Sequence, residues 1–225
     1  MSEIDDLEFF AGLSSQSRSR LRRQASLLEL LKGGIVYLPG DPGNTIYVLA
    51  EGRVKISKLS VAGKELTLAI HEPGELFGEL TLMDDHPRRT MATAMLPSRV
   101  WSIPKYEFQR LVLSSPAFAL RIGAIIGQRR RELESRMEGL VFRDVPTRLA
   151  RQLLQLARKY GVERDGSIEI EFKVSQLELA NMIGATRETT STALNELKRA
   201  GILETSHRNI VIRDLPTLRE IEGKL

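Results

Sequence analysis

The stretch from Lys173 to Leu203 constrains the fold most, because it reads as two short helices joined by a tight turn. Ser175 is a side-chain cap for the first helix. Gly184 ends that helix, since glycine takes a left-handed cap without strain. Thr186 caps a second helix, which Gly201 ends. The pattern predicts a helix-turn-helix, in which the second helix enters the DNA major groove by its N-terminal residues.

The other positions of this stretch distinguish a DNA-binding motif from an ordinary helical hairpin in a core. We place one apolar face on each helix, made by Leu177, Leu179, Ala180 and Ile183 in the first and by Ala193, Leu194 and Leu197 in the second. The first turns of the second helix carry Arg187, Glu188, Thr189, Ser191 and Thr192. Arginine can hold guanine O6 and N7 together, and glutamate can accept from cytosine N4. These side chains favour base readout over the core hairpin.

The run IGATRETTSTALNELKRAGIL resembles the recognition motif of the cyclic-AMP receptor protein/fumarate-nitrate regulator family of bacterial transcription factors. The resemblance extends from about Phe10 to Ile212. It implies an α+β fold with a cyclic-nucleotide-binding jelly-roll barrel, a long dimerisation helix and a C-terminal winged helix-turn-helix. It also implies a homodimer that binds double-stranded DNA at a two-fold symmetric site, with RNA polymerase as a further partner. The residues assigned to DNA binding are Ser175, Gln176, Thr186, Arg187, Glu188, Ser191, Thr192 and Arg208.

The sequence pattern of the N-terminal half changes from helical to β-rich along the chain. Residues 5–31 have helical character, with apolar faces made by Phe9, Phe10, Leu13, Leu21, Ala25 and Leu28. From Gly33 to Ile103, short β-rich runs are bounded by Gly, Pro, Asp or Asn at intervals of roughly 8–12 residues, which is typical of a small antiparallel barrel or jelly roll.

Within these runs, Leu76-Phe77-Gly78-Glu79-Leu80 and the following TLMDDHPRRT resemble the phosphate-binding cassette of cyclic-nucleotide-binding domains. Gly78 lets backbone N–H groups approach an anion at the start of a short helix. The resemblance implies that Glu79 accepts from a ribose hydroxyl and that Arg88, or Arg89 as the alternative, binds the cyclic phosphate bidentately. A surface ion pair between Glu79 and an arginine is the competing interpretation. The residues assigned to effector binding are Gly78, Glu79, Leu80, Arg88, Arg89, Thr90, Arg129 and Glu134.

Two departures from the family pattern affect the identity of the effector. Arg89 stands where Ser or Thr is common, and Leu133 and Glu134 stand where the cyclic-AMP receptor has a Thr-Ser pair that contacts adenine. The effector therefore remains open between cyclic AMP, another cyclic nucleotide, a cyclic dinucleotide, a different small molecule or none. No covalent cofactor is expected.

Residues 116–142 read as one long helix, about 40 Å in length. Ile122, Ile126, Leu133, Met137 and Leu140 form an a/d-like series interrupted around the arginines 129–131, and we assign it to dimerisation, with packing on the chain's own barrel as the alternative. Asp144 caps the next helix, with Pro146 in its first turn. The predicted domains are 1–115, a sensor; 116–143, the dimerisation helix; and 144–225, the winged helix-turn-helix, whose terminal hairpin turns at residues 206–209.

Composition excludes several other classes. The chain has no cysteine, so disulfides and cysteine-ligated clusters are excluded. No apolar run approaches the ~18 residues of a membrane span, and no secretory signal is visible, so we expect a cytoplasmic protein. The three histidines have no ligand spacing, so no metal site is predicted. No nucleophile–base arrangement or P-loop indicates an enzyme, although a regulatory subunit of an enzyme stays open as an alternative.

Overall fold

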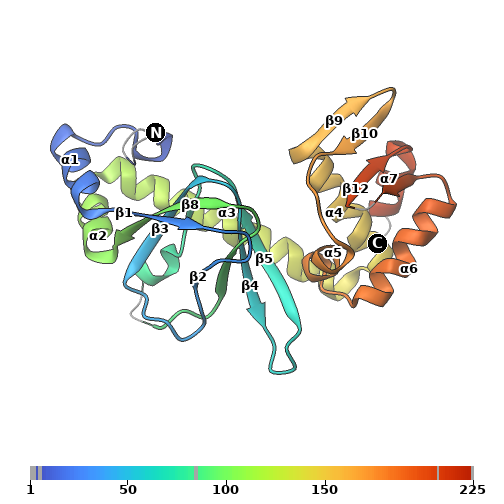
Figure 1. Ribbon diagram of the computed structural model, residues 1–225, viewed down its shortest axis with the longest axis horizontal. Coiled ribbons are helices and arrows are strands. Elements are labelled where there is room, and N and C mark those ends of the chain that lie inside the picture. The colour runs from blue at the N-terminus through green and yellow to red at the C-terminus, as the bar shows by residue number, and fades with distance from the viewer. Residues whose placement is uncertain (1–3, 5–6, 84–85, 207, 224–225) are drawn as a thin grey trace. The chain divides into compact units, whose positions relative to one another are not determined.

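The computed structural model describes residues 4, 7–83, 86–206 and 208–223 of the chain. The chain divides into two compact units, residues 1–130 and 131–225 (Figure 1). The boundary lies inside the long helix α3 (Pro116–Phe142), whose bounds agree with the helix predicted from the sequence. The finer division at residues 115 and 143 stays a prediction.

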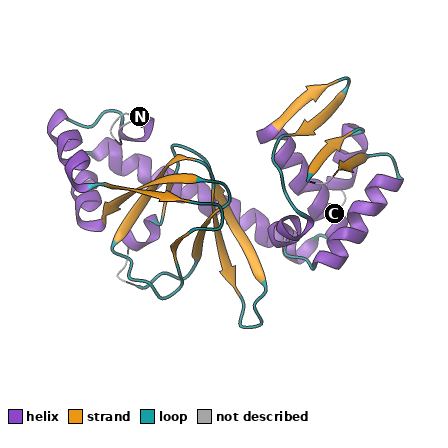
Figure 2. Cartoon of the chain, viewed as in Figure 1, coloured by secondary structure: helices purple, strands orange, loops and turns teal. Residues whose placement is uncertain are grey.

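The first unit is a jelly roll of two antiparallel four-stranded sheets, as the sequence predicted (Figure 2). Their strand orders are β1-β8-β3-β6 and β2-β7-β4-β5. The strands are β1 (Ser26–Leu30), β2 (Ile35–Tyr37), β3 (Thr45–Glu51), β4 (Val54–Leu59), β5 (Glu65–His71), β6 (Leu76–Phe77), β7 (Met91–Ala94) and β8 (Ser98–Pro104).

The N-terminal segment is less helical than predicted. A short 3-10 helix η2 (Glu8–Phe10) precedes α1 (Ser15–Gln24), which Ser14 caps by accepting from the Ser17 amide at 3.2 Å. The helix expected over residues 5–31 is wrong beyond Gln24, because Ser26–Leu30 forms β1 and pairs with β8. Pairing with β8 satisfies backbone groups that a helix would satisfy locally, so tertiary context overrides local propensity here.

Two apolar clusters support the first unit. One lies between the sheets and includes Tyr37, Tyr47 and Phe77. The other packs the N-terminal segment against β3, α2 (Lys105–Ser114) and the start of α3. Ile122 is 2% exposed within this second cluster and Ile126 packs partly against it. The dimerisation role assigned to Ile122 is thus corrected, since its side chain is used inside its own chain.

The second unit is a winged helix-turn-helix. Its sheet has the order β11-β12-β10-β9. The elements are α4 (Val145–Tyr160), β9 (Gly161–Arg164), β10 (Ser167–Ile170), α5 (Gln176–Ile183), α6 (Arg187–Arg199), β11 (Leu203–Ser206), β12 (Asn209–Ile212) and α7 (Leu215–Glu222). Asp144 caps α4 as predicted, accepting from the Thr147 amide at 2.9 Å. In the predicted terminal turn, His207 lies outside the described residues.

No single helix in the described ranges is long and apolar enough to cross a membrane. Among the described helices, the pair α2 and α3 taken together, across a bend of 116°, passes that test of length and composition.

Candidate ligand site and nucleic-acid interface

The turn after β6 requires glycine at position 78. Gly78 has φ +76° and precedes the 3-10 helix η3 (Glu79–Leu82). A Cβ at this position would lie 2.8 Å from Nη1 of Arg88 and 3.2 Å from the Tyr47 ring. The positive φ therefore favours glycine, and a Cβ here would also require the Arg88 guanidinium to shift.

Arg88 is a buried cation at the centre of the candidate ligand site. Its residue is 6% exposed, Nη1 donates to the Gly78 carbonyl at 2.9 Å, and Nη2 donates to the Thr45 carbonyl. The guanidinium lies over the Tyr37 ring, 4.4 Å from its centroid, a cation–π arrangement. The third nitrogen, Nε, is buried and has no hydrogen-bond partner among the described residues. An anion that reached Nε would satisfy this donor.

The backbone fixes where Arg88 lies. Its amide donates to the Asp41 carbonyl and its carbonyl accepts from the Gly40 amide, both at 2.8 Å. The adjacent Arg89 is exposed. Of the two arginines left open by the sequence, the structure brings Arg88 to the glycine turn and leaves Arg89 at the surface.

Aromatic rings line the same region and were not predicted as site residues. Tyr37 and Tyr47 stack with centroids 5.7 Å apart, and Tyr47 stacks on Phe77 at 5.2 Å. Burial raises the pKa of Tyr37, while a hydrogen bond from Thr90 and the charge of Arg88 act against that rise. Strand alternation places Tyr47 inward, but only the sheet pairing shows that these rings lie against Arg88.

Glu79 forms an ion pair with the long helix. Its Oε2 lies 2.8 Å from Nη1 of Arg129, and the two side chains are 7% and 23% exposed. Arg129 also donates through Nη2 to the Leu76 carbonyl, and the same nitrogen lies 3.4 Å from Nδ1 of His71. The pairing of Glu79 with an arginine is thus real but mostly buried, and its partner comes from α3 and not from the cassette strand.

His71 completes this cluster. It is 4% exposed, its Nδ1 lies 2.9 Å from Oε2 of Glu75, and its ring stacks on Phe77 at 5.4 Å. No group of three His, Asp or Glu side chains in the described part of the chain could hold a metal ion. His71 therefore acts here as a packed, hydrogen-bonded ring of the site wall.

Of the remaining residues assigned to effector binding, one lies in the site and two lie outside it. Thr90 is half-buried and its hydrogen bond to Tyr37 acts against the rise in the pKa of that side chain, so Thr90 belongs to the site. Leu80 is 66% exposed on η3. Glu134 is exposed on the part of α3 that belongs to the second unit. The structure thus brings together Gly78, Glu79, Arg88, Thr90 and Arg129, all from the first unit.

In the second unit, α5 begins as the sequence predicted. Ser175 and Glu178 form a capping box, with the Glu178 amide donating to Ser175 Oγ at 3.2 Å and the Ser175 amide donating to Glu178 Oε2 at 2.7 Å. Leu177 is 54% exposed, which corrects its assignment to the apolar face. Residues two apart on a helix point in nearly opposite directions, so Leu177 cannot share a face with the buried Leu179. Gln176 is exposed.

The helix α6 presents a polar first turn. Thr186 caps it, accepting from the Thr189 amide at 3.1 Å. Arg187, Glu188 and Thr192 are exposed and Ser191 is half-exposed, while Ala193, Leu194 and Leu197 are buried as predicted. Hydrogen bonds from its own backbone amide and from the Thr186 hydroxyl lower the pKa of Glu188. A negatively charged Glu188 thus stands at the positive end of the helix dipole.

Two other residues assigned to DNA have distinct settings. The Thr192 hydroxyl donates to the Glu188 carbonyl at 3.1 Å, which commits its hydrogen to the helix. Arg208, next to the start of β12, is exposed.

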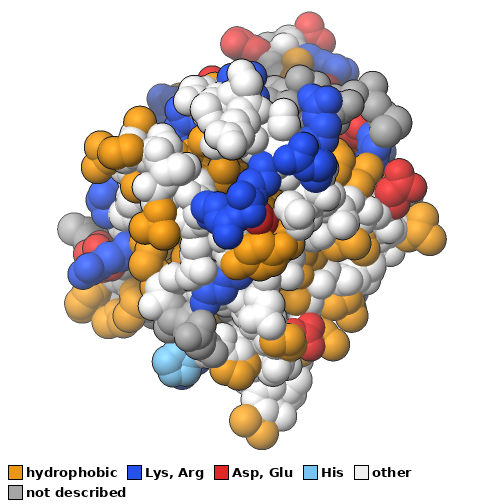
Figure 3. Space-filling view, turned by 90° about the vertical axis from the view of Figure 1, so that its left-hand side faces the viewer, with side chains coloured by type: hydrophobic (Ala, Val, Ile, Leu, Met, Phe, Trp, Pro, Cys, Tyr) orange, Lys and Arg blue, Asp and Glu red, His pale blue; other side chains and the backbone are white. Residues whose placement is uncertain are grey.

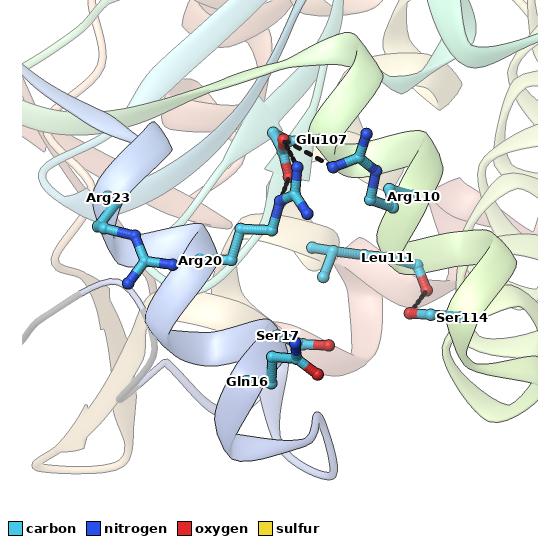
Figure 4. Close-up of a pocket in the computed structure, with 8 residues that line it drawn as sticks. All are labelled: Gln16, Ser17, Arg20, Arg23, Glu107, Arg110, Leu111 and Ser114. Carbon is cyan, nitrogen blue, oxygen red and sulfur yellow. Dashed lines mark hydrogen bonds and ion pairs between the residues drawn. The ribbon is translucent and has the colours of Figure 1, made fainter.

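A pocket of about 260 Å³ lies away from all these residues, between α1 and α2 (Figure 4). Glu107, 3% exposed, accepts from Arg20 at 2.8 and 3.0 Å, and Arg110 approaches it at 3.5 Å. Arg23 also lines this pocket, and basic side chains are prominent on this face of the molecule (Figure 3). Because Glu107 pairs with two of the arginines, its clearest role is to fasten α1 to α2.

Comparison with known families agrees with this architecture. The family "Cyclic nucleotide-binding domain" matches residues 27–115, and the family "Crp-like helix-turn-helix domain" matches residues 147–221. The first of these ranges contains Gly78, Glu79 and Arg88, and the second contains α5 and α6.

Individual relatives match nearly the whole chain. The "CRP-like cAMP-activated global transcriptional regulator" of Mycobacterium tuberculosis is 30% identical over 205 residues, covering 91% of this chain and 92% of that protein. The "Global nitrogen regulator" of Synechococcus elongatus is 30% identical, covering 80% and 82%. The structure of a CooA mutant from Carboxydothermus hydrogenoformans superimposes with a TM-score of 0.80 at 29% identity, covering 99% and 96%. The first of these relatives is named as a transcriptional regulator, and the second as a regulator. The chain therefore belongs to the cyclic-AMP receptor protein/fumarate-nitrate regulator family of DNA-binding transcription regulators.

Proposed function

We propose that this regulator works as a homodimer that reads a two-fold symmetric DNA site and is controlled by a cyclic nucleotide bound in its N-terminal barrel. The observation that carries the effector proposal is the buried guanidinium of Arg88. Its Nε is an orphan donor among the described residues, and its charge stands against aromatic rings and carbonyls. Burying a cation without a counter-charge is costly, so a bound phosphate relieves a cost already present in the fold.

The other residues of the site suit the ribose-phosphate half of such a ligand. Glu79 uses Oε2 toward Arg129, and its second carboxylate oxygen can accept from a ribose hydroxyl. Binding at Glu79 would thereby act on Arg129 and on α3. The Glu79–Arg129 ion pair would thus link the bound ligand directly to α3. Such a link supports a mechanism in which the ligand shifts the protein between two global states.

The base half of the ligand is less constrained. The Mycobacterium tuberculosis relative is described as cAMP-activated. Another structural neighbour, from Xanthomonas campestris, is described as responsive to c-di-GMP; it has a TM-score of 0.79 at 24% identity. Our first candidate is cyclic AMP, with a cyclic dinucleotide as the second because exposed Arg89 offers a further cation beside the site.

We assign DNA reading to the first turns of α6. In this proposal, Arg187 binds a guanine and Glu188 accepts from the cytosine of a neighbouring pair. Thr192, whose hydroxyl hydrogen is committed to the helix, cannot form a bidentate contact with guanine. Its methyl group suits a thymine methyl instead. Arg208 suits a phosphate.

Dimerisation is assigned to the later part of α3. Leu133, Met137 and Leu140 are 43%, 65% and 42% exposed, an apolar row at helical spacing that a second copy would cover. Contact with RNA polymerase is proposed from family membership alone.

Calorimetric titration of the dimer tests the effector proposal. Wild type should bind cyclic AMP with measurable heat, Arg88→Leu should bind at least about 100-fold more weakly through loss of a charge-assisted pair, and Arg89→Leu should bind cyclic AMP as wild type does. Cyclic GMP and cyclic di-GMP are titrated in parallel. Absence of heat with all three nucleotides would refute the proposal. Loss of binding in Arg89→Leu alone would assign the phosphate contact to Arg89 instead of Arg88.

A further inference from the structure

The last turns of α3 have two contrasting faces. Residues 131–142 belong to the same compact unit as the helix-turn-helix. Leu133, Met137 and Leu140 form an exposed face, which we call the seam face. Ser135, Arg136 and Gly139 recur at helical spacing on another side, where they are half-buried or buried. We call this second set the docking face, because Arg136 and Ser135 form hydrogen bonds with α5 and α4.

Arg136 makes the most informative contact of the docking face. Its Nη2 donates to the Met182 carbonyl at 2.6 Å. Met182 lies in the last turn of α5, where carbonyls have no partner within the helix. A cation is favoured at this negative end of the helix dipole. Met182 is 4% exposed, so its buried carbonyl would lack a hydrogen-bond donor if Arg136 were removed.

The guanidinium gives up solvation to make this contact. Burial lowers the pKa of Arg136, and the charge of Glu132 acts in the opposite direction. A side chain held only for solubility would stay hydrated. The position of Arg136 is therefore specific to the end of α5.

Two further hydrogen bonds hold the same end of α3. Arg151 of α4 donates to Ser135 Oγ at 2.6 Å, and Arg143 donates to the Glu222 carbonyl of α7 at 3.1 Å. The helices α4 and α5 in turn pack against α6. The orientation of α6 relative to residues 131–142 is thus fixed through α4 and α5.

We propose that Arg136 is a positioning residue that determines which spacing between DNA half-sites the dimer accepts. This inference rests on the proposed homodimer, in which the seam faces of two copies meet at the two-fold axis. Each seam face is then joined through one helix to its own docking face, and through Arg136 to α5 and α6. One added base pair moves a half-site by about 3.4 Å and turns it by about 35°, so only a firmly oriented α6 can reject it.

The experiment measures binding to synthetic duplexes that carry two copies of the wild-type half-site. The duplexes have the optimal spacing or one base pair more or less, and a fourth carries a single half-site. The proteins are full-length wild type, Arg136→Met, Arg136→Lys and Arg131→Met. Arg131 is the matched control, since it is an exposed arginine on the same helix.

Wild type and Arg131→Met should prefer the optimal spacing equally. In Arg136→Met, the preference should fall by about tenfold or more, the factor expected for one hydrogen bond to a charged group. Affinity for the single half-site should not change, which a general loss of folding would not allow. Arg136→Lys retains one donor and should be intermediate, and it remains informative should Arg136→Met fold poorly.

Different outcomes would overturn the role of Arg136 and the proposed homodimer. An unchanged spacing preference in Arg136→Met and Arg136→Lys would overturn the inference alone. A wild-type protein that binds the single half-site as tightly as the optimal duplex would overturn the dimeric function, and the inference with it.

Discussion

Replacing Glu79 with Gln removes one charge from the ion pair between the cassette and α3 while keeping the shape of the side chain. Glu79 is 7% exposed and its partner Arg129 is 23% exposed, so the pair is mostly shielded from solvent. Removing one partner of a fully buried pair costs about 3–5 kcal/mol, whereas exposed pairs contribute about 0–1 kcal/mol. Because Arg129 is partly hydrated and keeps the Leu76 carbonyl as an acceptor, we expect a loss of about 2 kcal/mol.

This loss should appear as a lower unfolding temperature of the first unit. At about 2–4 °C per kcal/mol for a chain of this size, the expected decrease is about 4–8 °C. Scanning calorimetry of the ligand-free protein measures it. The control is Glu51→Gln, because Glu51 is 58% exposed in its 3.0 Å pair with Arg99. At about 0–1 kcal/mol, that variant should unfold within about 4 °C of wild type, and therefore lose less than Glu79→Gln.

A double-mutant cycle then isolates the pair itself. Glu79→Gln and Arg129→Gln together should cost less than the sum of the two single changes, because both remove the same interaction. Equal unfolding temperatures for wild type and Glu79→Gln, or strict additivity in the cycle, would refute the claim that this ion pair joins the cassette to α3.

Three further predictions concern other surfaces. Replacing Leu133 and Met137 together with Glu should produce monomers in sedimentation velocity, because it places like charges across the seam face; intact dimers would rule out that face. Arg208→Ala should weaken binding to all DNA sequences alike and reduce the salt slope by about one unit, as expected for a single phosphate contact; a change in sequence preference would assign Arg208 to bases instead. Glu107→Ala should destabilise the first unit by about 1–2 kcal/mol in chemical unfolding, because Arg20 and Arg110 lose their buried partner but are 43% and 53% exposed and stay hydrated; a neutral effect would mean that α1 is held by apolar contacts alone.

Local signals in the sequence were sufficient for the helix ends. Ser175, Thr186 and Asp144 were predicted as caps and all three are caps, because a cap depends on residues only two or three positions away. The long helix and the β-rich barrel were also predictable from periodicity and turn spacing.

Features that depend on distant pairing were not predictable in the same way. Ser26–Leu30 was assigned to a helix because its leucines fit helical spacing, and only β8 makes it a strand. Tyr37, Tyr47 and Arg88 come from three separate segments of the chain, and the fold brings both rings against the guanidinium. Arg129 was assigned to the site only through the family resemblance, since fifty positions separate it from Glu79.

Selection of binding sites from random DNA, with wild type and Arg187→Ala, tests most directly whether α6 reads bases as we claim. Wild type should select a two-fold symmetric motif with half-sites about 10 base pairs apart, centre to centre. In Arg187→Ala, preference should relax at one guanine in each half-site, with a loss of about 1–3 kcal/mol. The same selected motif from both proteins, with no position relaxed, would show that Arg187 at the start of α6 does not read a base.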